Sequence, residues 1–414
     1  MKRWIAIGLV ALMGFSIAGC SSDEPVDGGK GGAAKQTEKE AEGDKGAQKA
    51  ADSETIRIGL YGTITGPNAI AGEMLDKGAQ IAIKEVNEAG GINGKQLELV
   101  VYDDKSNPEG ALKAVTRLVD VDKVKAMVGS NSSPNILGTV EVTEKAKVLQ
   151  VGAGTSPTYT NANYKYLFRG TANGELPNAA AVKGMKEMGV KTIGILSVAA
   201  ENGESGIKSF KALMGDDIKV VAEEKYQATD TDYTGQIAKI INANPDGVLI
   251  YGMTNESALA IKQFRRNGYE GYIYGPEAMG VTDLLNVAGE EADNVIFGSA
   301  AVVPASVEDA TNEIEKKMLQ AFVDEYGSMP ISDVVYRGYD GVRLIAEALK
   351  TCKDINDPES IREAFVNLKG VELTQGTYDF SEATGDGLKE AKTFIIQGGK
   401  HLPFESWRAE NPDK

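Results

Sequence analysis

Short apolar runs rich in Val and Ile recur along most of this chain and alternate with stretches that have helical periodicity. The apolar runs cover residues 56–61, 97–102, 126–129, 148–152, 192–197, 247–251, 272–275 and 295–298. Runs of this kind are typical of buried parallel strands. Helical periodicity occurs over residues 78–87, 109–119, 176–188, 233–242, 256–267 and 311–326. The alternation predicts an α/β fold with doubly wound sheets.

The length of the chain limits how this pattern can be divided. Residues 55–414 make up about 360 of the 414 residues, which is too long for one domain of ordinary size and suits two. We therefore expect two α/β lobes. In such sheets a ligand binds beyond the carboxyl ends of the strands, so residues directly after the apolar runs are the candidates for function.

The N-terminus has the features of a signal peptide. The basic pair Lys2 and Arg3 precedes an apolar stretch over residues 4–18, and Gly19 and Cys20 follow. The stretch is too short to span a hydrocarbon core of roughly 30 Å, so a transmembrane anchor is the weaker interpretation. The sequence predicts an extracytoplasmic protein.

Residues 17–20, Ile-Ala-Gly-Cys, resemble the lipobox of bacterial lipoproteins. This resemblance implies lipid attachment at Cys20, and the alternative is an ordinary secretory peptide. Residues 21–54 hold few sizeable apolar side chains, so they cannot bury enough surface to fold and are predicted to form a disordered tether. The mature protein would then be anchored to a membrane by lipid without crossing it.

The composition excludes several function classes. The formal net charge is −16 and no dense basic cluster follows the leader, so nucleic acid is not an expected partner. Besides Cys20 the only cysteine is Cys352, in the helix-like run 341–352, and we interpret it as a small buried apolar residue. His401 is the only histidine. We therefore predict no histidine triad, no metal site and no cofactor.

Four loops that follow predicted strands are informative. The first, over residues 61–72, is rich in glycine but lacks the G-x-G-x-x-G spacing and the P-loop lysine, so it does not predict a nucleotide site. In the second, Ser133 suits a helix N-cap and Pro134 the first helical position. The N–H groups of a helix N-terminus can hold a carboxylate. The alternative is that Ser133 only caps its own helix.

The third loop, over residues 153–157, offers hydrogen-bond donors to a ligand, and the fourth, over residues 274–280, offers an acceptor. Gly154 leaves its backbone open to a ligand, and Thr155 can donate a hydroxyl hydrogen bond. Glu277 follows a strand of the expected second lobe, and a carboxylate in a ligand cleft needs a cation. The alternatives are an ordinary turn at residues 153–157 and an exposed glutamate at position 277.

From residue 55 to about residue 405 the chain resembles the branched-chain amino acid binding family, the Leu/Ile/Val-binding type of periplasmic binding protein. The resemblance lies in short motifs at residues 65–67 (Thr-Gly-Pro), 87–94, 102–104 (Tyr-Asp-Asp), 129–133, 275–277 (Gly-Pro-Glu) and 339–341 (Tyr-Asp-Gly). Each motif is weak alone, but the set in this order is specific.

The resemblance implies the type I periplasmic binding fold, with two Rossmann-like doubly wound lobes and a hinge of three crossing segments. Lobe one is expected over residues 55–172 and 302–375, lobe two over residues 173–301 and 376–405, and a tail over residues 406–414. The resemblance also implies that Ser133 and Thr155 hold the carboxylate of an amino acid and that Glu277 holds its ammonium group.

The chain departs from the family pattern around the expected ligand. Positions where leucine-type binders carry large aromatic side chains correspond here to Ala71, Asn202 and Thr254. Smaller, more polar walls argue against a strict leucine or isoleucine site and leave room for a polar or longer side chain. Short-chain amides, urea-like compounds and aromatic acids also occur as family ligands and stay open as alternatives.

The expected function is capture of a small molecule, an amino acid in the first instance, by a lipid-anchored monomer that delivers it to an ABC permease. A secreted hydrolase would need a nucleophile with a base, but no G-x-S-x-G elbow occurs and His401 stands alone, so we do not expect an enzyme. A ligand sensor for a signalling receptor would use the same cleft and stays open as an alternative.

Overall fold

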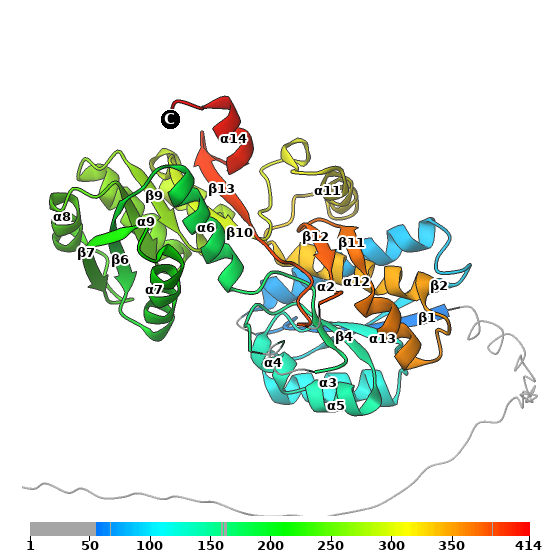
Figure 1. Cartoon of the computed structure of the whole chain (residues 1–414). Helices are drawn as coiled ribbons and strands as arrows, with labels where there is room; N and C mark the ends of the chain where they lie inside the picture. The colour runs from blue at the N-terminus through cyan, green and yellow to red at the C-terminus, as the bar shows by residue number, and fades with distance from the viewer. Residues whose placement is uncertain (1–54, 67, 159, 161–163, 383) are drawn as a thin grey trace, which may run out of the picture. The chain divides into compact units, whose positions relative to one another are not determined.

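The computed structural model describes residues 55–414 except residues 67, 159, 161–163 and 383 (Figure 1). The predicted signal peptide, Cys20 and the predicted tether lie outside the described residues. The described chain is built on two main sheets, and each sheet with its helices forms one lobe.

The first lobe contains a five-stranded sheet in which all neighbouring strands are parallel. In spatial order its strands are β2 (Gln96–Asp103), β1 (Thr55–Gly62), β3 (Ala126–Gly129), β4 (Leu149–Gly152) and β5 (Leu167–Arg169). Its helices are α2 (Ala69–Glu88), α3 (Pro108–Asp120), α4 (Ser133–Leu137), α5 (Val140–Ala146), α11 (Glu313–Tyr326), α12 (Val334–Thr351) and α13 (Pro358–Val366), with the 3-10 turn η3 (Val307–Asp309) before α11.

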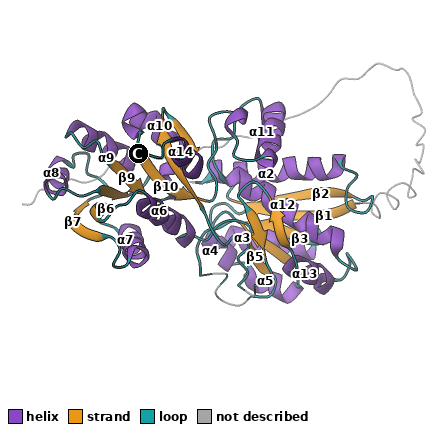
Figure 2. Ribbon diagram, turned by 45° about the horizontal axis from the view of Figure 1, so that its top comes forward, coloured by secondary structure: helices purple, strands orange, loops and turns teal. Residues whose placement is uncertain are grey.

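Successive residues of a strand point to opposite faces of a sheet, and helices cover both faces of this one. Leu60 and Val128 belong to a core shared with α2 and α12, and Tyr61 and Met127 belong to a second core shared with α3. Figure 2 shows helices on either side of the first sheet. Burial on both faces explains why the strands are continuous apolar runs in the sequence.

The second lobe contains a seven-stranded sheet. In spatial order its strands are β14 (Lys400–Pro403), β13 (Lys392–Gln397), β10 (Val295–Ser299), β9 (Tyr272–Gly275), β8 (Gly247–Tyr251), β6 (Thr192–Val198) and β7 (Lys219–Tyr226). The strands from β7 to β10 pair in parallel, and β13 and β14 add antiparallel. Its helical segments are α6 (Glu175–Glu187), α7 (Glu201–Met214), α8 (Thr234–Asn242), α9 (Thr254–Arg266), η1 (Glu277–Gly280), α10 (Thr282–Ala288), η2 (Gly289–Ala292) and α14 (Phe404–Glu410).

The chain passes between the two sheets three times, after β5, after β10 and before β13. The small sheet of β11 (Lys369–Glu372) and β12 (Thr377–Asp379) precedes the last passage. Tyr378, Phe380 and Leu388 belong to the core of the first lobe. This lobe therefore continues past residue 375, where the sequence predicted its end, because three large apolar side chains beyond that point pack into it.

The eight predicted strands are confirmed, and each differs from the structure by at most one residue at either end. The structure adds β5, β7 and β11 to β14. The residues predicted as a C-terminal tail begin inside α14, where Trp407 is buried and packs against Phe404 and Tyr272. The sequence prediction missed this helix because its pattern is short and lies next to the end of the chain.

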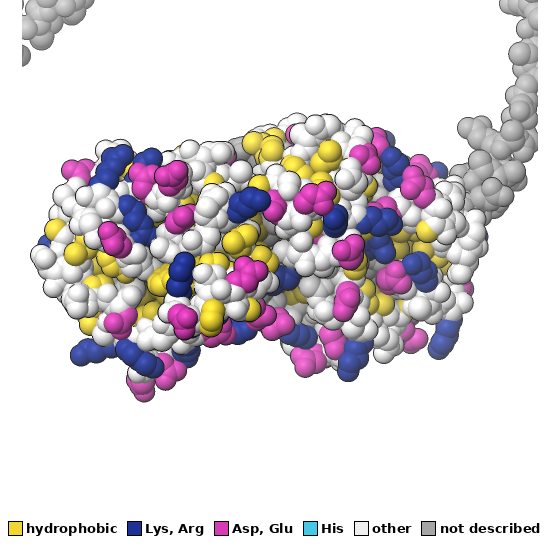
Figure 3. Space-filling view, turned by 90° about the horizontal axis from the view of Figure 1, so that it is seen from above, with side chains coloured by type: hydrophobic (Ala, Val, Ile, Leu, Met, Phe, Trp, Pro, Cys, Tyr) yellow, Lys and Arg dark blue, Asp and Glu magenta, His cyan; other side chains and the backbone are white. Residues whose placement is uncertain are grey.

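Charged side chains of both signs are interspersed on the surface, as one face shows in Figure 3. Many form exposed ion pairs, such as Lys84 with Glu325 at 2.6 Å and Lys186 with Asp217 at 2.7 Å. Exposed pairs of this kind contribute only about 0–1 kcal/mol each. The fold therefore depends on its apolar cores much more than on these pairs.

Candidate functional site

The loops that follow strands β1 to β4 are held together by hydrogen bonds. Asn131 accepts a hydrogen bond from the Thr63 N–H at 3.1 Å and donates one to the Thr63 hydroxyl at 2.7 Å. The Ser130 hydroxyl donates to Asp104 at 2.6 Å, and the Ser130 carbonyl accepts from the Ala153 N–H at 3.1 Å. The carboxyl edge of the first sheet is thus a connected set of loops.

Ser133 and the loop after β4 lie together, as the sequence predicted. Helix α4 begins at Ser133 with Ser132 as its N-cap, so the prediction that Ser133 is the N-cap is wrong by one residue. The Ser133 hydroxyl accepts a hydrogen bond from the Ser156 N–H at 3.1 Å. A Cβ atom on Gly154 would lie 2.5 Å from Ser133 Oγ, so this close approach requires glycine.

Glu277 lies at the start of η1, immediately after β9. Its Oε1 is 3.4 Å from the Ser299 hydroxyl and 3.8 Å from Nη2 of Arg337, and the side chain is 31% exposed. Burial raises the pKa of Glu277 above its ordinary value, the Arg337 cation opposes this rise, and Asp333 adds to it. Glu277 is therefore not the isolated, exposed glutamate of the alternative interpretation.

Arg337 connects Glu277 to the loop after β4. Its Nη1 donates to the Ala153 carbonyl at 3.2 Å, and its Nε and Nη2 donate to Asp333 at 3.1 and 2.5 Å. The side chain is 10% exposed and extends from α12. The sequence analysis missed Arg337, although its i, i+4 spacing from Asp333 at a helix start was a signal that an ion pair would orient it.

The remaining predicted site residues lie in three different helices. Thr254 begins α9, and its hydroxyl donates to the Ala278 carbonyl at 3.1 Å, beside Glu277. Ala71 lies in the first turn of α2 and packs against the first-lobe core. Asn202 lies in the first turn of α7, where it is exposed. The structure thus brings Thr254 to Glu277 and places Ala71 and Asn202 at helix starts of the first and second lobe.

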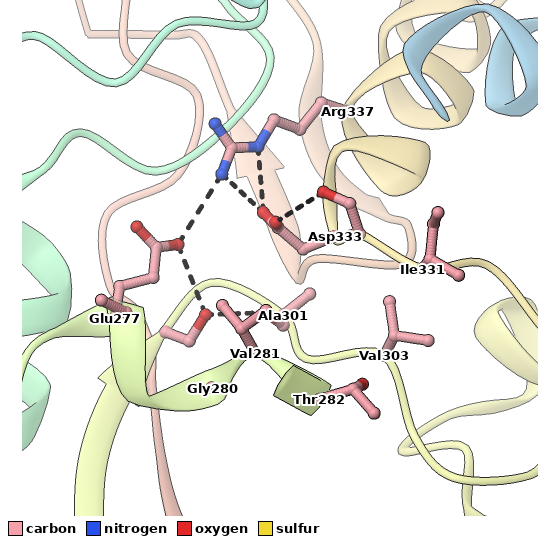
Figure 4. A pocket seen from close by; sticks show the side chains of 12 residues that line it. Glu277, Gly280, Val281, Thr282, Ala301, Val303, Ile331, Asp333 and Arg337 are labelled. Atoms are coloured by element: carbon pink, nitrogen blue, oxygen red, sulfur yellow. Dashed lines mark hydrogen bonds and ion pairs between the residues drawn. The ribbon is translucent and has the colours of Figure 1, made fainter. Parts of the chain in front are cut away.

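A pocket of about 270 Å³ opens beside Glu277 and Arg337 (Figure 4). It is lined by Glu277, Ala278, Gly280, Val281, Thr282, Ser299, Ala301, Val303, Ile331, Ser332, Asp333 and Arg337. Two carboxylates and one guanidinium give this lining a net negative charge. The charge of the pocket therefore favours a ligand with a cationic group.

His401 and Cys352, which the sequence analysis also considered, do not line this pocket. His401 lies on β14 with its ring edge-on to Phe297, and burial lowers its pKa to about 4. Cys352 is half-buried at the end of α12, its thiol donates to the Leu349 carbonyl at 3.4 Å, and burial raises its pKa. Over the described residues no group of three or more His, Cys, Asp and Glu side chains could hold a metal ion.

The profile of the family described as periplasmic binding protein matches residues 55–400. The chain belongs to the periplasmic binding protein family. The predicted resemblance and the predicted fold class are both confirmed. No helix among the residues that the structure describes is long and apolar enough to cross a membrane.

The relatives of this periplasmic binding protein are substrate-binding proteins. A leucine-, isoleucine-, valine-, threonine- and alanine-binding protein of Pseudomonas aeruginosa is 31% identical over 333 residues, which cover 80% of this chain and 87% of the relative. The leucine-specific-binding protein of Salmonella typhimurium is 28% identical over 252 residues, covering 60% of this chain and 68% of the relative. The likeness to the first relative extends over nearly the whole described chain.

Solved structures agree with this assignment. The branched-chain amino acid transporter substrate-binding protein LivJ from Streptococcus pneumoniae, in complex with isoleucine, has a TM-score of 0.68 and 28% identity, covering 84% of this chain and 97% of that one. The leucine-binding protein LivK from Thermotoga maritima has a TM-score of 0.63 and 25% identity, covering 84% and 99%. This periplasmic binding protein therefore has the type I fold of branched-chain amino acid transporter substrate-binding proteins.

Proposed function

We propose that this protein binds an amino acid between its two lobes and delivers it to an ABC permease. Ser133, Gly154 and Thr155 of the first lobe hold the ligand carboxylate, and Glu277 of the second lobe holds its ammonium group. The observation that carries this proposal is the position of Arg337, which contacts Glu277 on one side and the Ala153 carbonyl on the other. Arg337 therefore lies between Glu277 and the loop that contains Gly154 and Thr155.

The relatives support an amino acid as the ligand. The Pseudomonas aeruginosa relative is named for leucine, isoleucine, valine, threonine and alanine, and the Streptococcus pneumoniae structure contains isoleucine. A ligand that contacts both lobes stabilises the closed arrangement over an open one, because only the closed arrangement provides both sets of contacts. Ala71, Asn202 and Thr254 would form the part of the site that selects the ligand side chain.

Thermal unfolding with a panel of single amino acids tests this proposal. A ligand present at 100 times its dissociation constant adds about 2.7 kcal/mol of stability, which raises the melting temperature measurably. Native mass spectrometry of gently purified protein would weigh any ligand that co-purifies. If no amino acid raises the melting temperature and no amino acid mass co-purifies, the proposal is wrong.

An amide or urea-like ligand is the second candidate, and one observation favours it. Glu277 already has Arg337 as a neighbouring cation, so an uncharged ligand could occupy the pocket without replacing that contact. The same melting experiment with acetamide and urea separates the candidates. Stabilisation by these compounds alone would replace the amino acid proposal.

The proposal also covers how the protein is anchored and where its lobes begin and end. The protein acts as a non-enzymatic monomer held outside the cytoplasm by lipid on Cys20, with residues 21–54 as the tether. Its first lobe takes residues 55–172 and 302–388, and its second lobe takes residues 173–301 and 389–414. The first-lobe core residues Tyr378, Phe380 and Leu388 support the revised lobe boundary.

A further inference from the structure

We propose that Arg169 is a positioning residue that orients the loop after β4 and links it, through Asp386, to the segments that cross between the lobes. This inference rests on the proposed function, because it assigns that loop to the ligand. Arg169 ends β5 and its side chain is fully buried. Its Nη1 donates to the Gly154 carbonyl at 2.9 Å, and its Nη2 donates to the Ser156 carbonyl at 2.8 Å and the Thr160 hydroxyl at 2.9 Å.

These bonds fix the direction of the peptide groups in the loop. In a trans peptide the carbonyl and the following N–H point in opposite directions. Because the Gly154 carbonyl faces Arg169, the Thr155 N–H points away from Arg169. The Thr155 carbonyl accepts from the Gly174 N–H at 2.9 Å, so the Ser156 N–H points the other way, to Ser133. Two consecutive peptide groups of the loop are thus each held by a hydrogen bond at the carbonyl.

The same guanidinium is bound to the crossing segments. Arg169 Nε donates to Asp386 Oδ1 at 2.6 Å, and the Arg169 N–H donates to the Gly385 carbonyl at 2.9 Å. The other Asp386 oxygen is 3.5 Å from the Asn173 amide, in the segment that leaves β5. Asp386 lies in the stretch that leads to the last crossing, and its carboxylate also contacts Asn173 in the first crossing segment.

Only arginine suits this position. A buried guanidinium needs a counter-charge and must satisfy its N–H groups, and here Asp386 supplies the charge while backbone carbonyls accept the remaining bonds. Lysine has the charge but lacks the planar fork that reaches two carbonyls and a carboxylate together. Arg169 can therefore transmit a displacement of the loop to Asp386 as one rigid group.

Hydrogen exchange of the ligand-free protein tests the positioning role, with Arg169→Lys as the variant. The amides of residues 154–156 and of Thr158 are expected to exchange at least tenfold faster, while amides of β8 and β9 stay unchanged. Arg265→Lys is the matched control, because Arg265 also donates to backbone carbonyls, those of Tyr269, Gly271, Glu291 and Asp293, but lies in the second lobe. Unchanged exchange at residues 154–158 in Arg169→Lys overturns the inference.

Ligand protection tests the link to the crossing segments. In the unmodified protein, threonine, isoleucine or alanine is expected to slow exchange both at residues 154–158 and at residues 384–390. In Asp386→Asn, which keeps the size of the side chain and removes its charge, the ligand still slows the loop but slows residues 384–390 at least threefold less. Equal protection of both segments in the variant overturns the link, because a purely structural role would leave the pattern intact.

The outcomes separate this inference from the proposed function. If none of the three amino acids slows exchange anywhere in the unmodified protein, the amino acid proposal fails, and the ligand-free comparison of Arg169→Lys with Arg265→Lys decides the role of Arg169. If Arg169→Lys does not fold, Asp386→Asn replaces it in the ligand-free comparison. Faster exchange at residues 154–158 in Asp386→Asn supports the inference, and unchanged exchange contradicts it.

Discussion

The Glu277 carboxylate faces the guanidinium of Arg337, with Oε1 3.8 Å from Nη2, while the same nitrogen is 2.5 Å from Asp333. One cation is therefore shared between two carboxylates, and it is closer to Asp333. The Glu277 charge is only partly compensated inside the protein. A ligand ammonium group that reaches Glu277 would complete this compensation and leave Arg337 paired with Asp333.

Replacing Glu277 with Gln should weaken amino acid binding. The change keeps the size of the side chain but removes the charge, and because Glu277 is partly exposed we expect a loss of about 2–4 kcal/mol, roughly thirtyfold to a thousandfold in affinity. Calorimetric titration of the parent and the variant measures this loss of affinity. Asp283→Asn is the matched control, since Asp283 is an exposed carboxylate in the first turn of nearby α10. If a folded Glu277→Gln protein binds the amino acid within threefold of the parent, Glu277 does not bind the ligand ammonium group.

Amino acid affinity should fall in acid at a higher pH than an ordinary glutamate predicts. The ligand needs ionised Glu277, whose pKa is raised above 4.5 by burial, so affinity is full above the raised pKa and falls up to about tenfold per pH unit below it. Arg337→Gln removes the cation that opposes the rise, so its loss should begin at a still higher pH. Titrations between pH 4 and 8 measure this, and a flat parent profile down to pH 4.5 would refute it.

His401 should make the protein less stable in mild acid. Its pKa is lowered from 6.5 to about 4, so the unfolded chain binds the proton more tightly than the folded one. The stabilisation is fully present above pH 6.5 and is lost as the pH falls to about 4, by up to about 3 kcal/mol. Urea unfolding at pH 4.5 and 7 of the parent and His401→Gln measures it. An equal pH dependence in both proteins would show that other groups are responsible.

Replacing Cys20 with Ser should move the protein from the membrane fraction to the soluble fraction. The proposed anchor is the lipid on Cys20, and the described residues contain no helix that could cross a membrane. A chain that begins at Ser21 serves as the second measurement, because it lacks the leader as well. It should be soluble and bind the same ligand as the full chain. Insolubility or loss of binding in that shortened chain would contradict the tether.

The sequence predicted eight strands and missed β5, β7 and β11 to β14. Most side chains of the predicted strands are buried, but β2 lies at the edge of the first sheet and is only partly buried. Strand β7 was missed because it is half-exposed and contains the charged run 223–225 (Glu-Glu-Lys). Strand β5 has only three residues, which is too short for a periodic signal. Edge and short strands form through pairing with neighbours, and a single run of sequence does not contain that information.

Three of the candidate site residues were chosen because they follow predicted strands. Ser133, Gly154 and Glu277 lie directly after β3, β4 and β9, so the topology of a parallel sheet locates them. Arg337 and Arg169 reach the same loop from the first turn of α12 and from the end of β5. Their roles depend on tertiary contacts across long stretches of chain, and the spacing along the sequence gave no measure of those distances.

The three passages between the sheets have a consequence for how the protein is made. The first-lobe core joins α2, near the start of the described chain, to α12 and Phe380, and the second-lobe sheet includes β13. During synthesis neither core can be completed until almost the whole chain has been produced. Secretion in an unfolded state is therefore compatible with this topology, and cutting the chain at the second crossing would leave both halves with an incomplete interior rather than yielding two separable parts.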